Sequence, residues 1–198
     1  MTQNFLGASV FLIQTFAGLY LILLLLRFQM QLSRVNYYNP ICQAIIKATA
    51  GPLKPFRKVL PTIKRLDLST LSFALILQLL TISIVMFLNG GHIFHPVYIG
   101  WSLVGLLSTA LKIYYFSLII LVITSWVAPY SNHPAVELVN QLTEPLCSPA
   151  RKILPPMGGL DFSIIIVFVG ITLLDSYLLI RPLASMLLIP KGLVLGLQ

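Results

Sequence analysis

The sequence predicts an all-α membrane protein. Its four transmembrane helices form two tandem repeats of the same orientation, each with a cytoplasmic amphipathic helix. Of the 198 residues, 58% are hydrophobic and only 9% are charged, whereas a soluble domain carries about 25% charged residues. Four apolar runs approach the roughly 20 residues that a spanning helix needs. A loop pattern also recurs at a spacing of 94 residues, as from Arg57 to Arg151.

The apolar runs are continuous, which excludes the period-two alternation of a transmembrane β-barrel. Backbone polar groups cannot stay unpaired in hydrocarbon, so each run is expected to be helical. The first run is interpreted as a retained span and not a signal peptide, because no basic residue precedes it. The predicted spans are Phe5–Leu26, Leu68–Leu88, about Leu106–Val127 and Phe162–Ile180.

Lysine and arginine predict the orientation, because they favour cytoplasmic loops. The loop between spans two and three has none, and Arg181 and Lys191 in the tail only weakly oppose the assignment. Loops 27–67 and 128–161 are therefore expected in the cytoplasm, with both termini on the opposite side of the membrane. The first loop carries eight basic residues: Arg27, Arg34, Lys47, Lys54, Arg57, Lys58, Lys64 and Arg65.

The recurring pattern indicates a duplicated unit, with repeats at residues 1–98 and 99–198. Both units start outside the membrane, so a pseudo-two-fold axis along the membrane normal is expected, as in parallel repeats. The residues that recur at the fixed spacing in the second unit are Pro55, Arg57, Lys58, Leu60, Pro61 and Asp67.

Each cytoplasmic loop is predicted to contain a short amphipathic helix that starts at a proline, Pro40 or Pro134, where a missing N–H costs nothing. Such a helix can lie in the headgroup region or pack on the protein's own loops. The first alternative is favoured because the adjoining segments are in the membrane. The apolar faces would be Ile41, Ala44, Ile45 and Ala48, and Ala135, Leu138, Val139 and Leu142.

These motifs resemble the YggT family of small bacterial membrane proteins over nearly the whole chain. The resemblance lies in the doubled Pro-x-Arg-Lys-x-Leu-Pro stretch, which a Pro-Leu pair precedes by one residue in the first repeat and two in the second, with an Asp-x-Ser at the start of the next span. The first repeat departs from the pattern, with Lys64-Arg65-Leu66 where the second has Gly158-Gly159-Leu160. No activity is agreed for the family.

The resemblance implies a protein of the bacterial inner membrane, with both termini periplasmic, that is linked to osmotic or extracytoplasmic stress. Its plastid and cyanobacterial relatives are linked to nucleoid distribution, division and cytochrome assembly. That spread of roles implies a scaffold or assembly factor.

The basic motif offers a candidate binding site. Arg57, Lys58, Arg151 and Lys152 would sit at headgroup depth, where cations attract anionic lipid phosphates or a partner protein. Two alternatives remain open: the cations only enforce orientation, or each arginine pairs with the nearby aspartate, Asp67 or Asp161.

These two aspartates begin the second and fourth spans and are expected to be helix N-caps. A proton or cation site is the minor alternative.

Polar residues inside the spans form a third candidate. At a rise of about 1.5 Å per residue, Gln14, Thr81, Lys112 and Asp175 are expected in one layer below the outer interface. Buried charges usually point at each other, so Lys112 and Asp175 are predicted to form an ion pair between spans three and four. Snorkelling of Lys112 to the surface is the alternative.

Catalytic, metal and cofactor motifs are not expected. Cys42 and Cys147 fall in cytoplasmic loops, which argues against a disulfide. His92 and His95 are expected on the other side of the membrane from His133, so the three histidines cannot form one site. The basic residues that give the net charge of +8 lie next to apolar runs, so anionic lipids are a better partner than nucleic acid. The favoured function is a non-enzymatic scaffold with membrane-protein partners or self-association. The alternative is a small oligomeric ion channel or transporter.

Overall fold

Four long helices dominate the computed structural model, which describes residues 2–63, 65–127, 133–154, 161–190 and 192–194. Helices α1 (Thr2–Ser33), α3 (Leu68–Leu88) and α4 (Val97–Val127) are continuous. The fourth combines α6 (Ser163–Leu173), the π-helical turn η1 (Leu174–Leu178) and α7 (Ile180–Met186). All four are long and apolar enough to cross a membrane, which confirms the predicted all-α membrane fold.

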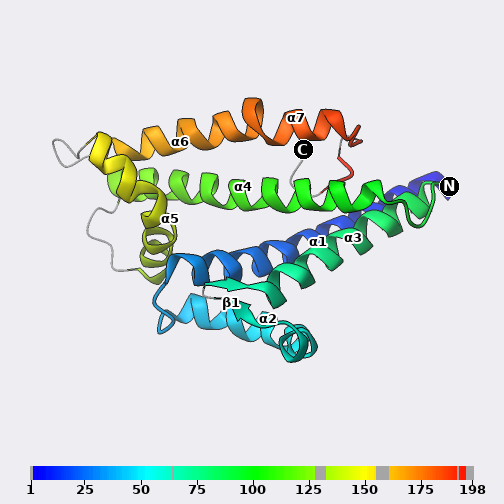
Figure 1. The fold of residues 1–198 in the computed structure, drawn as a ribbon, viewed down its shortest axis with the longest axis horizontal. Helices are drawn as coiled ribbons and strands as arrows, with labels where there is room; N and C mark the ends of the chain where they lie inside the picture. The colour runs from blue at the N-terminus through cyan, green and yellow to red at the C-terminus, as the bar shows by residue number, and fades with distance from the viewer. Residues whose placement is uncertain (1, 64, 128–132, 155–160, 191, 195–198) are drawn as a thin grey trace.

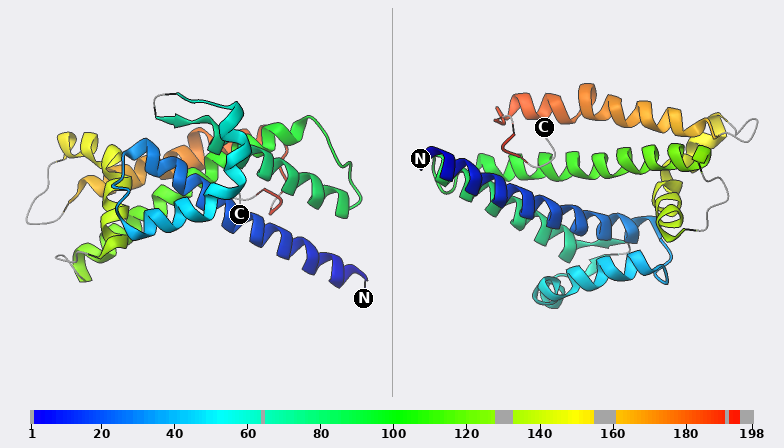
Figure 2. Two further views of the ribbon diagram at one scale, coloured as in Figure 1. Left: turned by 90° about the horizontal axis from the view of Figure 1, so that it is seen from below. Right: turned by 180° about the vertical axis from the view of Figure 1, so that it is seen from behind.

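Helix α4 is central in the bundle. In Figure 1 and in the rear view of Figure 2 it lies between the α1–α3 pair on one side and α6–α7 on the other. One core cluster joins Leu21 and Leu25 of α1, Ala74 of α3 and Leu106 of α4. A separate cluster joins α4, α5 and α6 through Leu118, among others. The two repeats are therefore held together mainly through α4.

Three spans are longer than predicted, and the fourth span runs on to Met186, six residues beyond the predicted Ile180. Helix α1 continues beyond Leu26 because its polar residues bond to neighbouring helices: Gln29 Nε2 donates to the Ala110 carbonyl oxygen, 2.8 Å away. Helix α4 begins at Val97, nine residues before the predicted Leu106. There the Trp101 indole N–H donates to the carbonyl oxygen of Leu187, at 2.9 Å. Apolarity alone underestimates the length of a helix whose polar groups are satisfied by tertiary hydrogen bonds.

The loop helices α2 (Pro40–Val59) and α5 (Pro134–Ile153) start at the expected prolines. The side chains of Asn39 and His133 cap them by accepting N–H bonds from the second helical residue. Both helices run on through internal prolines, which was not predicted. A helical proline leaves the carbonyl four residues earlier without its usual partner. For Pro52 that carbonyl belongs to Ala48, and the Tyr20 hydroxyl lies 3.4 Å from it as a donor.

The apolar faces of these helices pack on the protein. The buried stripe of α2 is Cys42, Ile45, Thr49 and Leu53, while Ala44 and Ala48 of the predicted face are exposed. Leu138 and Leu142 of α5 join Cys42 and Ile45 in one cluster. For Ile45, Leu138 and Leu142 the structure therefore shows the second alternative, packing on the protein itself.

The two loop helices lie at the same end of the bundle, away from the N-terminus, with α5 crossing the ends of α4 and α6 (Figure 1). The Asn39 side chain donates to the Pro134 carbonyl oxygen at 2.7 Å, and Gln141 Oε1 accepts the Asn36 N–H at 2.7 Å. We call α2 and α5 together the platform. Between α2 and α3, strands β1 (Thr62–Ile63) and β2 (Leu66–Asp67) form a minimal antiparallel hairpin.

Arg27 docks the platform onto α1. Arg27 is 7% exposed, and its Nη1 donates to the Thr49 hydroxyl and the Ile46 carbonyl oxygen of α2.

We expect Arg27→Leu to lower the melting temperature by about 3–10 °C. Hydrogen bonds to charged groups contribute about 1.5–3 kcal/mol, and 1 kcal/mol corresponds to about 2–4 °C at this chain length. As a control, Lys47→Leu removes an exposed cation from α2 and should change the melting temperature by less than about 1 °C. Equal melting of Arg27→Leu and wild type would show that docking does not depend on Arg27.

Candidate functional site

The first basic motif closes into an ion pair. Arg57 lies in the last turn of α2, and its Nη2 is 3.3 Å from Oδ2 of Asp67, the N-cap of α3. The Asp67 carboxylate also accepts the Thr70 N–H at 3.1 Å and the Thr70 hydroxyl at 2.8 Å. One buried carboxylate therefore joins the end of the loop helix to the start of the next span. We call this contact of Arg57, Asp67 and Thr70 the first elbow.

These contacts set the ionisation of Asp67. Burial by itself would raise the pKa of its carboxyl, but the two Thr70 bonds and Arg57 outweigh it and lower the pKa. The charged form is therefore favoured, and it complements the positive end of the α3 dipole. Arg57 is about half exposed, so water screens its ion pair, which is worth only about 0–1 kcal/mol.

The second elbow, formed by Arg151, Asp161 and Ser163, repeats the arrangement, with Glu144 as a further partner. Arg151 Nε lies 2.7 Å from Asp161 Oδ2, and Nη1 lies 2.8 Å from Glu144 Oε1. The Asp161 carboxylate accepts the N–H and the hydroxyl of Ser163. Burial would raise the pKa of Asp161, but Ser163 and Arg151 hold it below the usual value. The N-cap of α6 is Phe162, so Asp161 stands one residue before the predicted position and acts on the first helical N–H.

Both arginines of the predicted lipid site thus engage their own aspartates, which was the alternative from the sequence. Lys58 and Lys152 beside them are exposed. Exposed apolar residues follow at once: Val59 is 80% exposed and Ile153 is 75% exposed. A cation next to an exposed aliphatic side chain occurs at the same place in each repeat.

The charge of the platform is unequal. Helix α2 carries Lys47, Lys54, Arg57 and Lys58 without an acidic residue, whereas Glu137 and Glu144 balance the two cations of α5. At 3.6 residues per turn, the three lysines of α2 fall on one stripe, opposite the buried face. All three are exposed. We call this set, Lys47, Lys54 and Lys58, the lysine stripe.

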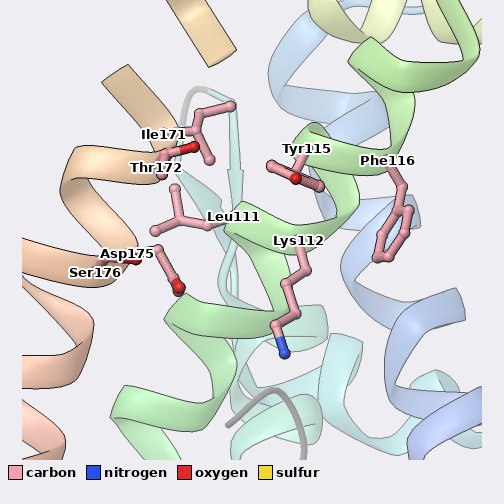
Figure 3. Close-up of a pocket in the computed structure, with 8 residues that line it drawn as sticks. All are labelled: Leu111, Lys112, Tyr115, Phe116, Ile171, Thr172, Asp175 and Ser176. Carbon is pink, nitrogen blue, oxygen red and sulfur yellow. The ribbon is translucent and has the colours of Figure 1, made fainter. Parts of the chain in front are cut away.

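Lys112 and Asp175 line one cavity, of about 250 Å³, between α4 and the π-turn η1. They do not form the predicted ion pair: in the described part of the chain, the ion pairs within 4.0 Å all belong to the elbows. In Figure 3 the Asp175 carboxylate projects toward α4, while the Lys112 side chain extends alongside α4. Lys112 is 15 residues from either end of α4 and therefore lies at the middle of that helix.

The other residues of the predicted polar layer have separate contacts. Gln14 Nε2 donates to the carbonyl oxygens of Gly192 and Leu193, at 3.0 and 3.2 Å, and so holds the C-terminal segment. The Thr81 hydroxyl donates to Leu77 in its own helix, at 2.8 Å. Of the four, Lys112 and Asp175 line one cavity, and the side chains of Gln14 and Thr81 form hydrogen bonds elsewhere.

Some polar residues important to the structure were not singled out from the sequence. The sequence marks Arg27 only as a loop cation, and the signal for Glu144 is its position seven residues before Arg151. Gln78 is fully buried in α3, and neither amide atom has a hydrogen-bond partner. Cys42 and Cys147 are free thiols, whose pKa burial raises. Within the described ranges, no three His, Cys, Asp or Glu residues could hold a metal ion.

Together, the fold and elbows define a multi-pass all-α membrane protein built from a duplicated unit. The CCB3/YggT family profile matches residues 6–88 and again residues 100–182, so the two matches share one offset at both ends. The chain belongs to this family.

Three similar bacterial proteins carry names that state no activity. A Pseudomonas aeruginosa protein is 42% identical over 94% of this chain and 95% of its own length. A Vibrio alginolyticus protein is 36% identical over 84% and 90%. Escherichia coli YggT is 35% identical over 80% and 82%. No solved structure is significantly similar.

The first elbow predicts different outcomes for two substitutions. Asp67→Ala removes both the cap and the charge and should lower the free energy of unfolding by about 1–2 kcal/mol, whereas Asp67→Asn keeps a good capping residue and should lower it less.

The elbows also predict a dependence of stability on pH. Because the pKa values of Asp67 and Asp161 are lowered, the two aspartates stabilise the fold above the ordinary carboxyl pKa, about 3.9. This stability is lost as the pH falls through the lower folded-state pKa.

Melting curves between pH 7 and pH 3 test this. The wild type should lose stability at the acidic end. The double variant Asp67→Asn, Asp161→Asn should lose less over the same range, because its elbows no longer titrate. An identical acid profile for the two proteins would show that neither elbow carboxylate contributes.

Proposed function

We propose that this protein is a non-enzymatic scaffold of the bacterial inner membrane. Its platform binds anionic lipid headgroups on the cytoplasmic side and presents a surface to other membrane proteins or to a second copy of the chain. Its place in the response to osmotic or extracytoplasmic stress rests on the family resemblance alone. The observation that carries the proposal is the lysine stripe.

The stripe suits an anionic surface for three reasons. The buried face of α2 fixes the helix on the protein, so the lysines are held outward. No acidic residue of α2 competes for them, and their spacing along one side matches an extended surface better than a single small anion. Each juxtamembrane cation is worth about 1 kcal/mol near an anionic membrane.

The ends of α2 and α5 support the same orientation. Val59 and Ile153 are exposed aliphatic residues that directly follow Lys58 and Lys152. Such a pair suits the boundary between headgroups and acyl chains, where the aliphatic group enters the apolar layer and the ammonium stays in the polar one. The elbow ion pairs fix the depth of both residues relative to the next span.

Lipid retention should depend on the lysine stripe. The triple variant Lys47→Gln, Lys54→Gln, Lys58→Gln removes three cations worth about 1 kcal/mol each, so its affinity for phosphatidylglycerol should fall by a factor on the order of 100. Native mass spectrometry of the purified protein, titrated with phosphatidylglycerol or phosphatidylcholine, measures the difference. The matched control replaces the same lysines with arginine, which preserves charge and should preserve binding. If the glutamine variant keeps as much phosphatidylglycerol as wild type, the lipid proposal fails.

The orientation is tested by thiol labelling with new cysteines, since Cys42 and Cys147 are buried. In a chain with both replaced by serine, Ser148→Cys lies on the exposed part of α5, and Ile93→Cys lies at the opposite end of the bundle. A membrane-impermeant maleimide should label Ile93→Cys in intact spheroplasts, and Ser148→Cys only after permeabilisation. The reverse pattern would place the platform in the periplasm and remove the cytoplasmic scaffold.

A further inference from the structure

We propose that the cavity between α4 and η1 binds a small zwitterion that carries both an ammonium and a carboxylate group, such as a free amino acid. The carboxylate would meet Lys112 and the ammonium would meet Asp175. This inference goes beyond the scaffold function and uses none of its residues, so either proposal can fail without the other.

The cavity combines opposite charges with apolar walls. Leu111, Phe116 and Ile171 supply aliphatic and aromatic surface, while Lys112 and Asp175 supply the charges. Its volume of about 250 Å³ is just below the range of about 300–1,000 Å³ for drug-sized ligands, which favours a small molecule. Hydroxyl groups complete the polar lining, on Tyr115, Thr172 and Ser176.

Both charges lie deep within the spans. Lys112 is at the middle of α4, and Asp175 is 12 residues after Ser163 and 11 before Met186. Charged side chains at this depth are costly, and they mark functional sites more often than structural ones. These two line the same space without neutralising each other, and Asp175 Oδ1 is buried without a hydrogen-bond partner.

Charge balance selects the class of ligand. A lone cation at Asp175 would leave Lys112 uncompensated, and a lone anion at Lys112 would do the same to Asp175. An uncompensated charge in a low-dielectric site is far more costly than in water. A zwitterion supplies one partner to each side chain through charge-assisted hydrogen bonds, and the complex stays neutral.

The pair of opposite charges occurs in the second repeat and not at the equivalent positions of the first. At the fixed offset between the family matches, the counterparts of Lys112 and Asp175 are Gly18 and Thr81. The first-repeat helices α1 and α3 pack closely along their length (Figure 2). The second repeat instead has a cavity at these positions, and Asp175 stands on a π-turn, a distortion that is frequent at functional sites.

Thermal melting of the wild-type protein in lipid nanodiscs tests the proposal. The probes are glycine, alanine and serine as zwitterions, and ethylamine and acetate as analogues with one charge. At least one zwitterion should give a saturable rise of about 3 °C at roughly ten times its dissociation constant, while each single-charge analogue gives less than a third of that rise. Absence of a shift with all three zwitterions would overturn the proposal, and so would an equal shift with ethylamine or acetate.

Variants then locate the site. Lys112→Met and Asp175→Asn should each abolish the zwitterion shift, whereas Lys58→Met and Glu137→Gln, which alter exposed charges on the platform, should retain it. A shift that survives both cavity substitutions would place binding elsewhere and refute the site. If a cavity variant does not fold, the comparison of zwitterions with single-charge analogues on the wild type still decides the question.

Discussion

The ion pair between the arginine near the end of each loop helix and the aspartate before the next span fixes where the chain enters the membrane again. A span of about 20 residues only just crosses the hydrocarbon layer, and a shift by one helical turn moves every side chain by about 5.4 Å. Asp67 prevents such a shift in the first repeat, because it is at once the N-cap of α3 and the partner of Arg57. With the start of the span fixed, the lysine stripe, the exposed Val59 and the docking of α2 all have defined depths.

Much of this arrangement follows from the sequence, because its causes are local. Continuous apolarity predicts helical spans, and the recurrence of Pro55, Arg57, Lys58 and Asp67 predicts the two elbows. What could not be predicted depends on tertiary partners. Arg27 and Trp101 extend α1 and α4 because other helices satisfy their hydrogen bonds. The buried stripe of α2 is rotated from the predicted face because α5 and α1 decide which residues are covered.

Duplication has left the same frame with different chemistry in each half. The elbow pairs are repeated, yet the first loop helix carries four cations and no acid, while the second is balanced. Arg27, which docks α2 on α1, has Leu121 as its counterpart at the family offset, and α5 packs instead through Leu138 and Leu142. The first repeat thus concentrates charge on the surface of the platform, and the second places charge inside the membrane-spanning region.

The energetic weight of a charge differs between these two locations. Arg57 is about half exposed, and water and salt screen its pairing with Asp67, so this contact mainly sets geometry. Lys112 and Asp175 are at the middle of helices apolar enough to span a membrane, and in a bilayer each unbalanced charge there costs a few kcal/mol on insertion scales. A molecule that balances both charges therefore changes the stability of the second repeat more than any single surface contact of the platform can. Because α4 also carries the packing between the repeats, occupancy of the cavity beside it would act on the central helix of the bundle.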